Sequence, residues 1–197
     1  MLEKIIALDK DLFLYINGKH NGFFDTVMYW ASDKLFWFPF YALLLFFLIK
    51  IYKKESALIL LFIAVLITLC DQTASSLIKK TVKRLRPSHE PSLQNLVHLS
   101  EAGPGGQYGF ISSHSANAFG LAAFLFFLLP KKYNYLKFII TCWAILVAYS
   151  RIYNGVHYPS DVIVAAILGI IYGWLIKIVY DKVKSALAKK KPAATAD

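Results

Sequence analysis

Five long stretches of almost uninterrupted apolar residues follow a more amphipathic start of the chain. They span residues 35–52, 57–70, 113–129, 135–149 and 161–180, and the second continues as a more polar helical pattern to about residue 85. Several of their apolar cores are shorter than the roughly 20 residues that a full membrane crossing needs. Five such stretches in one short chain, with Tyr and Trp at their ends, nevertheless indicate a bilayer environment. We predict an all-α fold, an integral-membrane helical bundle with about five transmembrane helices.

The first 33 residues show an amphipathic pattern instead. Apolar residues recur at helical spacing between Leu2 and Ile16, charged residues fill much of the other face, and Asn17-Gly18 provides a stop. Residues 23–31 repeat the pattern in a shorter piece. We expect two amphipathic helices that lie on the membrane surface rather than cross it.

The composition supports one membrane-embedded domain over residues 1–184. The chain is 57% hydrophobic and 16% aromatic, with a mean hydropathy of +0.50, which is unusual for a water-soluble domain. Residues 185–197 are rich in Ala and Lys and are expected to form a disordered basic tail. Cys70 and Cys142 fall inside apolar stretches, so we expect both to be small buried hydrophobes.

The lysines are unevenly placed along the chain. A net charge of +10 suggests nucleic acid in a soluble protein, but here the lysines cluster at the ends of apolar runs, so we expect membrane lipids and no nucleic acid as partners. Clusters within 50–54, 131–137 and 177–191 predict two cytoplasmic loops and a cytoplasmic C-terminus. The opposite face then receives the N-terminal helices, the connection 86–112 and residues 151–160. A basic cluster at 79–86 also lies there, against the topology trend, which makes it a candidate for ligand binding.

The first candidate signature is Lys-x6-Arg-Pro within this basic cluster. Lys79 and Arg86 are two helical turns apart and project from nearly the same face. Two cations at a membrane boundary can hold several oxygens of one phosphate. The alternative, contact with lipid headgroups, suits Lys80, Lys83 and Arg84.

The second signature is Ser-x-His at the start of the third apolar stretch, after a Gly-rich loop. Ser112 is a natural N-cap, and the free N–H groups of a helix start favour an anion. His114 in the first turn has the chemistry to protonate a leaving oxygen. Simple helix capping with an incidental histidine is the alternative. His89, His98 and Glu101 of the preceding connection are expected to be ordinary loop residues, with contact to the lipid head group as the alternative. Asp71 is expected to hydrogen-bond a neighbouring helix, with a catalytic role as the alternative.

The third signature, Ser-Arg-x5-His-x3-Asp, lies between the last two apolar stretches. His157 and Asp161 are four residues apart, so the carboxylate can accept a hydrogen bond from one ring nitrogen and leave the other basic. Arg151 adds a forked cation suited to phosphate, and Pro159 suits the first turn of the following helix. A structural Arg151–Asp161 ion pair beside an ordinary histidine is the alternative.

Together and in this order, the three signatures resemble those of the type-2 phosphatidic-acid phosphatase family, membrane lipid phosphatases that share a site with vanadium haloperoxidases. The resemblance covers roughly residues 71–176, and the first and third signatures match fully. The middle one departs from the family's Pro-Ser-Gly-His, because this chain has Ile111-Ser112-Ser113-His114. Ser113 therefore carries a Cβ where the family brings glycine backbone against the phosphate.

The resemblance implies a role for each matching residue. It implies that His157 attacks phosphorus and forms a phosphohistidine, that Asp161 orients it, and that His114 acts as general acid. It implies that the phosphoryl oxygens are held by Lys79, Arg86, Ser112, Ser113 and Arg151. Because cations take the place of a metal, it implies a metal-independent reaction, and we expect no cofactor and no metal site.

The expected function is hydrolysis of the phosphomonoester or diphosphate of an amphiphilic lipid at the periplasmic face of a bacterial inner membrane. Undecaprenyl diphosphate and lipid A phosphate are favoured because the resemblance is to compact bacterial members. Phosphatidylglycerol phosphate and phosphatidic acid remain alternatives. A non-catalytic phospholipid-binding or translocating protein and a vanadate-dependent oxidant also stay open. The sequence predicts no oligomeric state.

Overall fold

Helices form all the regular secondary structure in residues 2–190, the part of the chain that the computed structural model describes. A π-helical segment, Gln72–Ile78, joins two helices into one continuous rod, and short 3-10 turns lie at Lys53–Glu55, Pro87–His89, Pro91–Leu93 and Lys131–Tyr133. The prediction of an all-α fold is confirmed. The helices are α1 (Leu2–Asn17), α2 (Gly22–Ser32), α3 (Phe38–Tyr52), α4 (Ser56–Asp71), α5 (Lys79–Val82), α6 (Ser113–Leu128), α7 (Asn134–Tyr153) and α8 (Pro159–Lys190).

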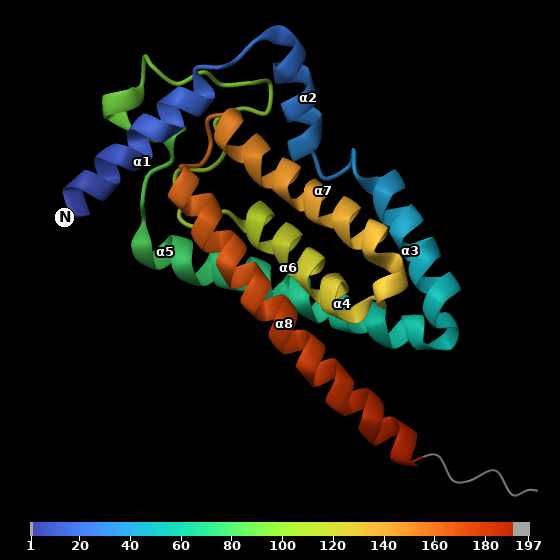
Figure 1. The fold of residues 1–197 in the computed structure, drawn as a ribbon. Coiled ribbons are helices and arrows are strands. Elements are labelled where there is room, and N and C mark those ends of the chain that lie inside the picture. Colours follow the sequence, from blue (N-terminus) through green and yellow to red (C-terminus); the bar gives the residue numbers. More distant parts are fainter. Residues whose placement is uncertain (1, 191–197) are drawn as a thin grey trace, which may run out of the picture.

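Three stretches of the described chain are long and apolar enough to cross a membrane. These are Phe38–Val82, Lys131–Tyr153 and Pro159–Lys189, while α6 is a shorter apolar helix. The first stretch holds two helices, because the chain turns sharply between α3 and α4 at Lys53, whose φ is 52° (Figure 1). The predicted membrane helical bundle is confirmed, and the number of crossings stays a prediction.

Helix α6 lies at the centre of the bundle, between α4, α7 and α8 (Figure 1). Its contact with α8 depends on glycine: a Cβ on Gly169 would lie 2.4 Å from the Ala116 carbonyl oxygen, and one on Gly173 would lie 2.6 Å from that of Gly120. Small residues spaced in this way let membrane helices approach backbone to backbone. The first half of α6 is therefore packed closely against the first half of α8.

The lysine-rich segments gather at one end of the bundle. The turns between α3 and α4 and between α6 and α7 lie at the end toward which α8 runs (Figure 1). There the Tyr52 hydroxyl donates to the Leu128 carbonyl at 2.8 Å, and Lys184 pairs with Glu55 at 2.5 Å. Helices α1 and α2 and the long connection after α5 lie at the opposite end, over the starts of α6 and α8 (Figure 1).

Four local expectations differ from the structure. Helix α3 begins at Phe38 rather than at residue 35, because Pro39 suits only a first turn. Cys142 is exposed on α7, although Cys70 is buried as expected. Asp71 accepts from Ser75 of its own rod at 3.5 Å rather than from a neighbouring helix. Helix α8 continues to Lys190, so residues 185–190 of the expected disordered tail are helical, and residues 191–197 lie outside the described part.

Candidate active site

His157 lies in the short connection between α7 and α8 and is only 1% exposed. Its backbone N–H bonds to the Arg151 carbonyl at 3.2 Å, so the chain folds back onto the end of α7. Helix α8 begins at Pro159, as the sequence predicts. The ring Nδ1 of His157 lies 3.4 Å from Oδ2 of Asp161, one turn into α8. Within the described residues this Nδ1 has no hydrogen-bond partner, so the ring faces the carboxylate without the hydrogen bond that the spacing predicts.

Asp161 is fully buried and is held from both sides. Its Oδ2 accepts from the Tyr158 backbone N–H at 3.0 Å and faces the imidazole, while its Oδ1 accepts from Arg84 at 2.9 Å. The partner of Asp161 is therefore Arg84, and the alternative ion pair with Arg151 does not form. A carboxylate fixed in this way orients the imidazole next to it and favours positive charge on the ring.

Arg84 and Asp9 also belong to the site, although no sequence signature predicts a catalytic role for either residue. Arg84 binds Asp9 of α1 at 2.7 Å, and its guanidinium stacks 4.0 Å from the Tyr158 ring centroid. Asp9 also accepts from the Ser160 backbone N–H at 2.9 Å, at the start of α8. The expectation of a lipid-headgroup contact is therefore wrong for Arg84. No spacing rule could find this pair, because its members lie 75 residues apart on different helices.

A short backbone pairing joins the first signature to the Gly-rich loop that precedes the second. The Arg86 N–H donates to the Gln107 carbonyl at 3.0 Å, and the Gly109 N–H donates to the Arg84 carbonyl at 2.9 Å. A Cβ on Gly109 would lie 3.1 Å both from Cγ of Arg86 and from Oδ2 of Asp161. Gly109, in the Gly-rich loop just before the second signature, is therefore packed between a residue of the first signature and one of the third.

Three cations of the signatures surround His157. Arg86 and Arg151 are each only 9% exposed, Lys79 is half-buried, and none of them forms an ion pair within residues 2–190. The buried Nε of Arg151 has no hydrogen-bond partner there either. An unpaired buried cation is costly, and several together suit a multiply charged oxyanion.

The same cations act on the nucleophile. Burial first, and then the charges of Arg86, Arg151 and Lys79, lower the pKa of His157 well below its ordinary value. His157 is therefore neutral at physiological pH, which is the form that can attack phosphorus.

The second signature lies at the start of α6. Ser112 caps the helix by accepting from the Ser115 N–H at 3.4 Å, and its own N–H donates to the Asp161 carbonyl at 3.2 Å. Ser113 is the first residue of α6 and is half-buried. His114 follows it, within electrostatic range of Arg151, His157 and Lys79. The structure thus brings all eight predicted site residues to one end of α6.

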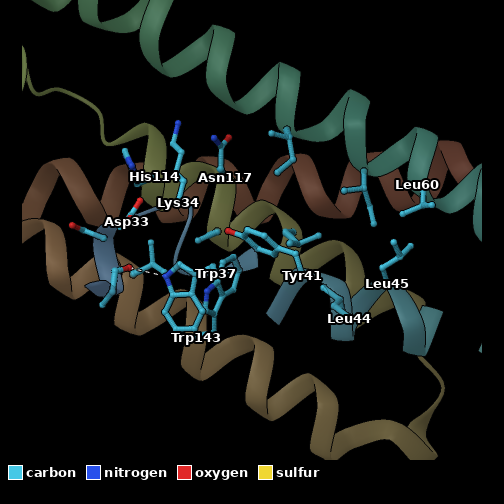
Figure 2. A pocket seen from close by; sticks show the side chains of 17 residues that line it. Asp33, Lys34, Trp37, Tyr41, Leu44, Leu45, Leu60, His114, Asn117 and Trp143 are labelled. Carbon is cyan, nitrogen blue, oxygen red and sulfur yellow. Dashed lines mark hydrogen bonds between the residues drawn. The ribbon is translucent and has the colours of Figure 1, made fainter. Parts of the chain in front are cut away.

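An apolar cavity of about 500 Å³ extends away from His114 between α3, α4, α6 and α7. Figure 2 shows Lys34, Asp33 and Asn117 beside His114 at one end of it. Leucines line the opposite end, namely Leu44, Leu45 and Leu60. Such a cavity suits a hydrocarbon chain whose polar head lies at His114. Within the described residues, the group that could hold a metal ion, His20, Asp25 and His98, lies outside this site.

Comparison with known proteins agrees with this geometry. The PAP2 superfamily model matches residues 56–185. A lipid A 4′-phosphatase of Bacteroides thetaiotaomicron is 38% identical over 194 residues, which cover 98% of this chain and 85% of that protein.

Two crystal structures share the fold. Aquifex aeolicus LpxE superposes with a TM-score of 0.63 at 30% identity, covering 89% of this chain and 95% of that one. The first transmembrane PAP2-type phosphatidylglycerolphosphate phosphatase from Bacillus subtilis superposes with a TM-score of 0.65 at 25% identity, covering 91% and 88%. With the family match extending over most of the bundle, the chain belongs to the PAP2 superfamily and is a membrane lipid phosphatase.

Proposed function

We propose that this lipid phosphatase removes the 4′-phosphate of lipid A, an acylated sugar phosphomonoester. The observation that carries the phosphatase chemistry is the pair of buried guanidinium groups of Arg86 and Arg151, which form no ion pair within residues 2–190, next to a neutral His157. The choice of lipid A is supported by the Bacteroides thetaiotaomicron relative, which matches almost the whole of this chain.

In the proposed reaction, the Nε2 atom of His157 attacks phosphorus while the bond from phosphorus to the sugar oxygen breaks. The negative charge of the bound phosphate favours a protonated His114, which gives its proton to that oxygen, so the sugar leaves as an alcohol. Asp161 faces Nδ1 and stabilises the positive charge of the phosphohistidine. Water, deprotonated by His114, then attacks phosphorus, releases inorganic phosphate and restores His157.

The phosphoryl oxygens are held throughout by the cations and hydroxyls of the three signatures. Lys79, Arg86 and Arg151 neutralise the charge that spreads over these oxygens in the transition state. Ser112, Ser113 and the N–H groups at the start of α6 complete this phosphate-binding site, which we call the phosphate cup. An acyl chain occupies the cavity beyond His114, which keeps the lipid anchored in the membrane while its head group reacts.

We further propose that the protein spans a bacterial inner membrane several times, with the active site in the periplasm and the C-terminus in the cytoplasm. The arrangement is supported by the lysine-rich turns and the end of α8, which lie together at the end of the bundle away from His157. Positive residues are enriched on the cytoplasmic side of membrane proteins.

Undecaprenyl diphosphate is the second candidate substrate. Lys34 lies beside His114 at the polar end of the cavity, where the leaving group would sit (Figure 2). A cation at this place favours a leaving group that is itself a phosphate, as in a lipid diphosphate.

A lipid panel tests the proposal. Purified protein in detergent is assayed for phosphate release from bisphosphorylated lipid A, undecaprenyl diphosphate, phosphatidylglycerol phosphate and phosphatidic acid. We expect lipid A to be the best substrate, with loss of the 4′-phosphate shown by fragment mass spectrometry. Preferential release from undecaprenyl diphosphate, or from the 1-position of lipid A, would overturn the assignment.

A nucleophile variant completes the test. His157→Ala should lose at least about a thousandfold in kcat, because the covalent route is removed, while the protein stays folded in detergent. The wild-type rate should survive EDTA, since cations of the chain perform the electrostatic role. Substantial residual turnover by His157→Ala would exclude the nucleophile assignment.

A further inference from the structure

His20, Asp25 and His98 meet at the end of the molecule that carries α1 and α2. His20 lies in the connection between these helices, Asp25 in the first turn of α2, and His98 in the long connection after α5. One potential ligand atom from each residue lies within 4.8 Å of the other two. The Nε2 atom of His98 is 3.0 Å from Oδ1 of Asp25, and the two imidazoles stack with centroids 3.8 Å apart.

The positions of His98 and Asp25 are fixed by buried groups. The side chain of Asn17 accepts from the His98 N–H at 2.8 Å and donates to the His98 carbonyl at 2.8 Å. The hydroxyl of Tyr153 donates to Oδ1 of Asp25 at 2.8 Å. Asn17 and Tyr153 are both buried. An outer group that orients a ligand carboxylate, as Tyr153 does for Asp25, is typical of metal sites, and Asn17 fixes the backbone that carries His98.

We propose that these three residues bind one zinc ion. Two imidazole nitrogens and one carboxylate oxygen form a common ligand set for zinc, with water in the fourth position. Nitrogen ligands disfavour Mg²⁺ and Ca²⁺, which prefer oxygen. His20 is exposed, so its ring is free to turn out of the stack and aim a nitrogen at the ion shared with His98.

The ion would link the long connection after α5 to helix α2, next to the segment that leads to His157. A Cβ on Gly155, whose φ is +80°, would lie 2.7 Å from the His98 carbonyl oxygen, so these backbones are in contact. Gly155 stands two residues before His157. Zinc at this site would stabilise the packing behind the nucleophile and take no part in phosphoryl transfer. The inference does not depend on which lipid is the substrate.

The test uses the full chain in detergent, freed of any affinity tag and of metal by chelation. Isothermal titration with zinc chloride should give one ion per chain, and the unfolding temperature should rise with zinc concentration. MgCl₂ and CaCl₂ should produce neither effect. Absence of zinc binding by the wild-type protein would overturn the proposal.

Variants locate the ion. His20→Ala, at an exposed position, and Asp25→Asn, which keeps the size of the side chain, should each weaken zinc binding by at least about tenfold. His89→Ala is the matched control, because His89 belongs to the same connection but contacts Ser88 instead. His157→Ala should bind zinc as the wild type does. Zinc binding that survives in His20→Ala and Asp25→Asn, or is lost in His157→Ala, would place the ion elsewhere and refute the site.

Discussion

The guanidinium of Arg84 binds the carboxylate of Asp9 at 2.7 Å, and this ion pair connects the N-terminal helix to the catalytic end of the bundle. The same guanidinium holds Asp161 at 2.9 Å, and Asp161 in turn faces the imidazole of His157. Through Asp9, helix α1 thus helps to orient the nucleophile, in addition to any role at the membrane surface.

Removing Arg84 should therefore slow catalysis more than it weakens substrate binding. Arg84→Gln deprives the buried Asp161 of a charged hydrogen bond, worth about 1.5–3 kcal/mol, so we expect kcat to fall about tenfold to a hundredfold with little change in KM. Asp9→Asn should show a smaller loss of the same kind. Steady-state kinetics on the dispersed lipid provide the measurement. Asp11→Asn, at an exposed position of α1, is the control, and an equal loss there would indicate a general effect of altering the helix.

The local geometry within each signature could be predicted from the sequence, because it depends on residues that lie only a few positions apart. The spacing of His157 and Asp161 fixes their contact through one turn of chain, and Ser112 caps α6 as its position before an apolar stretch indicates. These features follow from helical periodicity and capping alone.

The contacts that the sequence did not predict join segments that only the tertiary fold brings together. Asp9 hydrogen-bonds Ser160, which lies 151 positions away in the sequence, and His98 hydrogen-bonds Asp25, which lies 73 positions away. Neither residue stands out locally, because a charge on an amphipathic helix and a histidine in a loop are ordinary features of a surface. Cys142 was misjudged for a related reason: in a membrane bundle, an apolar stretch also has a lipid-facing side.

A methyl group at Gly109 should disturb the site without unfolding the protein. In Gly109→Ala, the new Cβ would stand 3.1 Å from Arg86 and from Asp161, so one of them must shift. A misplacement of about 1 Å at a reacting centre costs about a hundredfold in rate, so for a displacement of a few tenths of an ångström we expect kcat to fall about threefold or more. Gly106→Ala is the control, since a Cβ there meets nothing within 4 Å. Equal rates for the two variants would contradict the close packing around Gly109.

The lowered pKa of His157 should make the folded protein less stable in acid. Below its ordinary pKa of about 6.5, the unfolded chain binds a proton at His157 that the folded chain does not accept. The contribution is absent above this pH, and it destabilises the fold increasingly as the pH falls toward the folded-state value. Thermal unfolding from pH 7.5 to 5 should show a smaller acid destabilisation for His157→Asn than for the wild type. Parallel curves would indicate that His157 takes up a proton in the folded state as easily as in the unfolded one.

Filling the apolar cavity should discriminate against long-chain substrates. Leu60→Trp adds bulk at the apolar end of the cavity and should exclude about two methylene groups of a chain, at about 0.8 kcal/mol each, which corresponds to about a tenfold loss in kcat/KM. Hydrolysis of p-nitrophenyl phosphate, which has no chain, should be unchanged. Leu61→Trp is the matched control, because Leu61 is the next residue on the same helix, is exposed and does not line the cavity. Equal effects of the two variants on the lipid would mean that the chain binds elsewhere.

The proposed orientation in the membrane predicts which positions an impermeant thiol reagent reaches in intact cells. Replacing the exposed Cys142 with Ser leaves the buried Cys70 as the only native thiol. In this background, Glu101→Cys lies in the exposed part of the long connection, at the end that carries the active site, and Lys131→Cys lies in the turn between α6 and α7 at the other end. With the outer membrane permeabilised and the inner membrane intact, we expect labelling at position 101 and protection at position 131 until the cells are lysed. The reverse pattern would place the phosphate cup in the cytoplasm, and the proposed substrate would then have to be presented at the cytoplasmic leaflet.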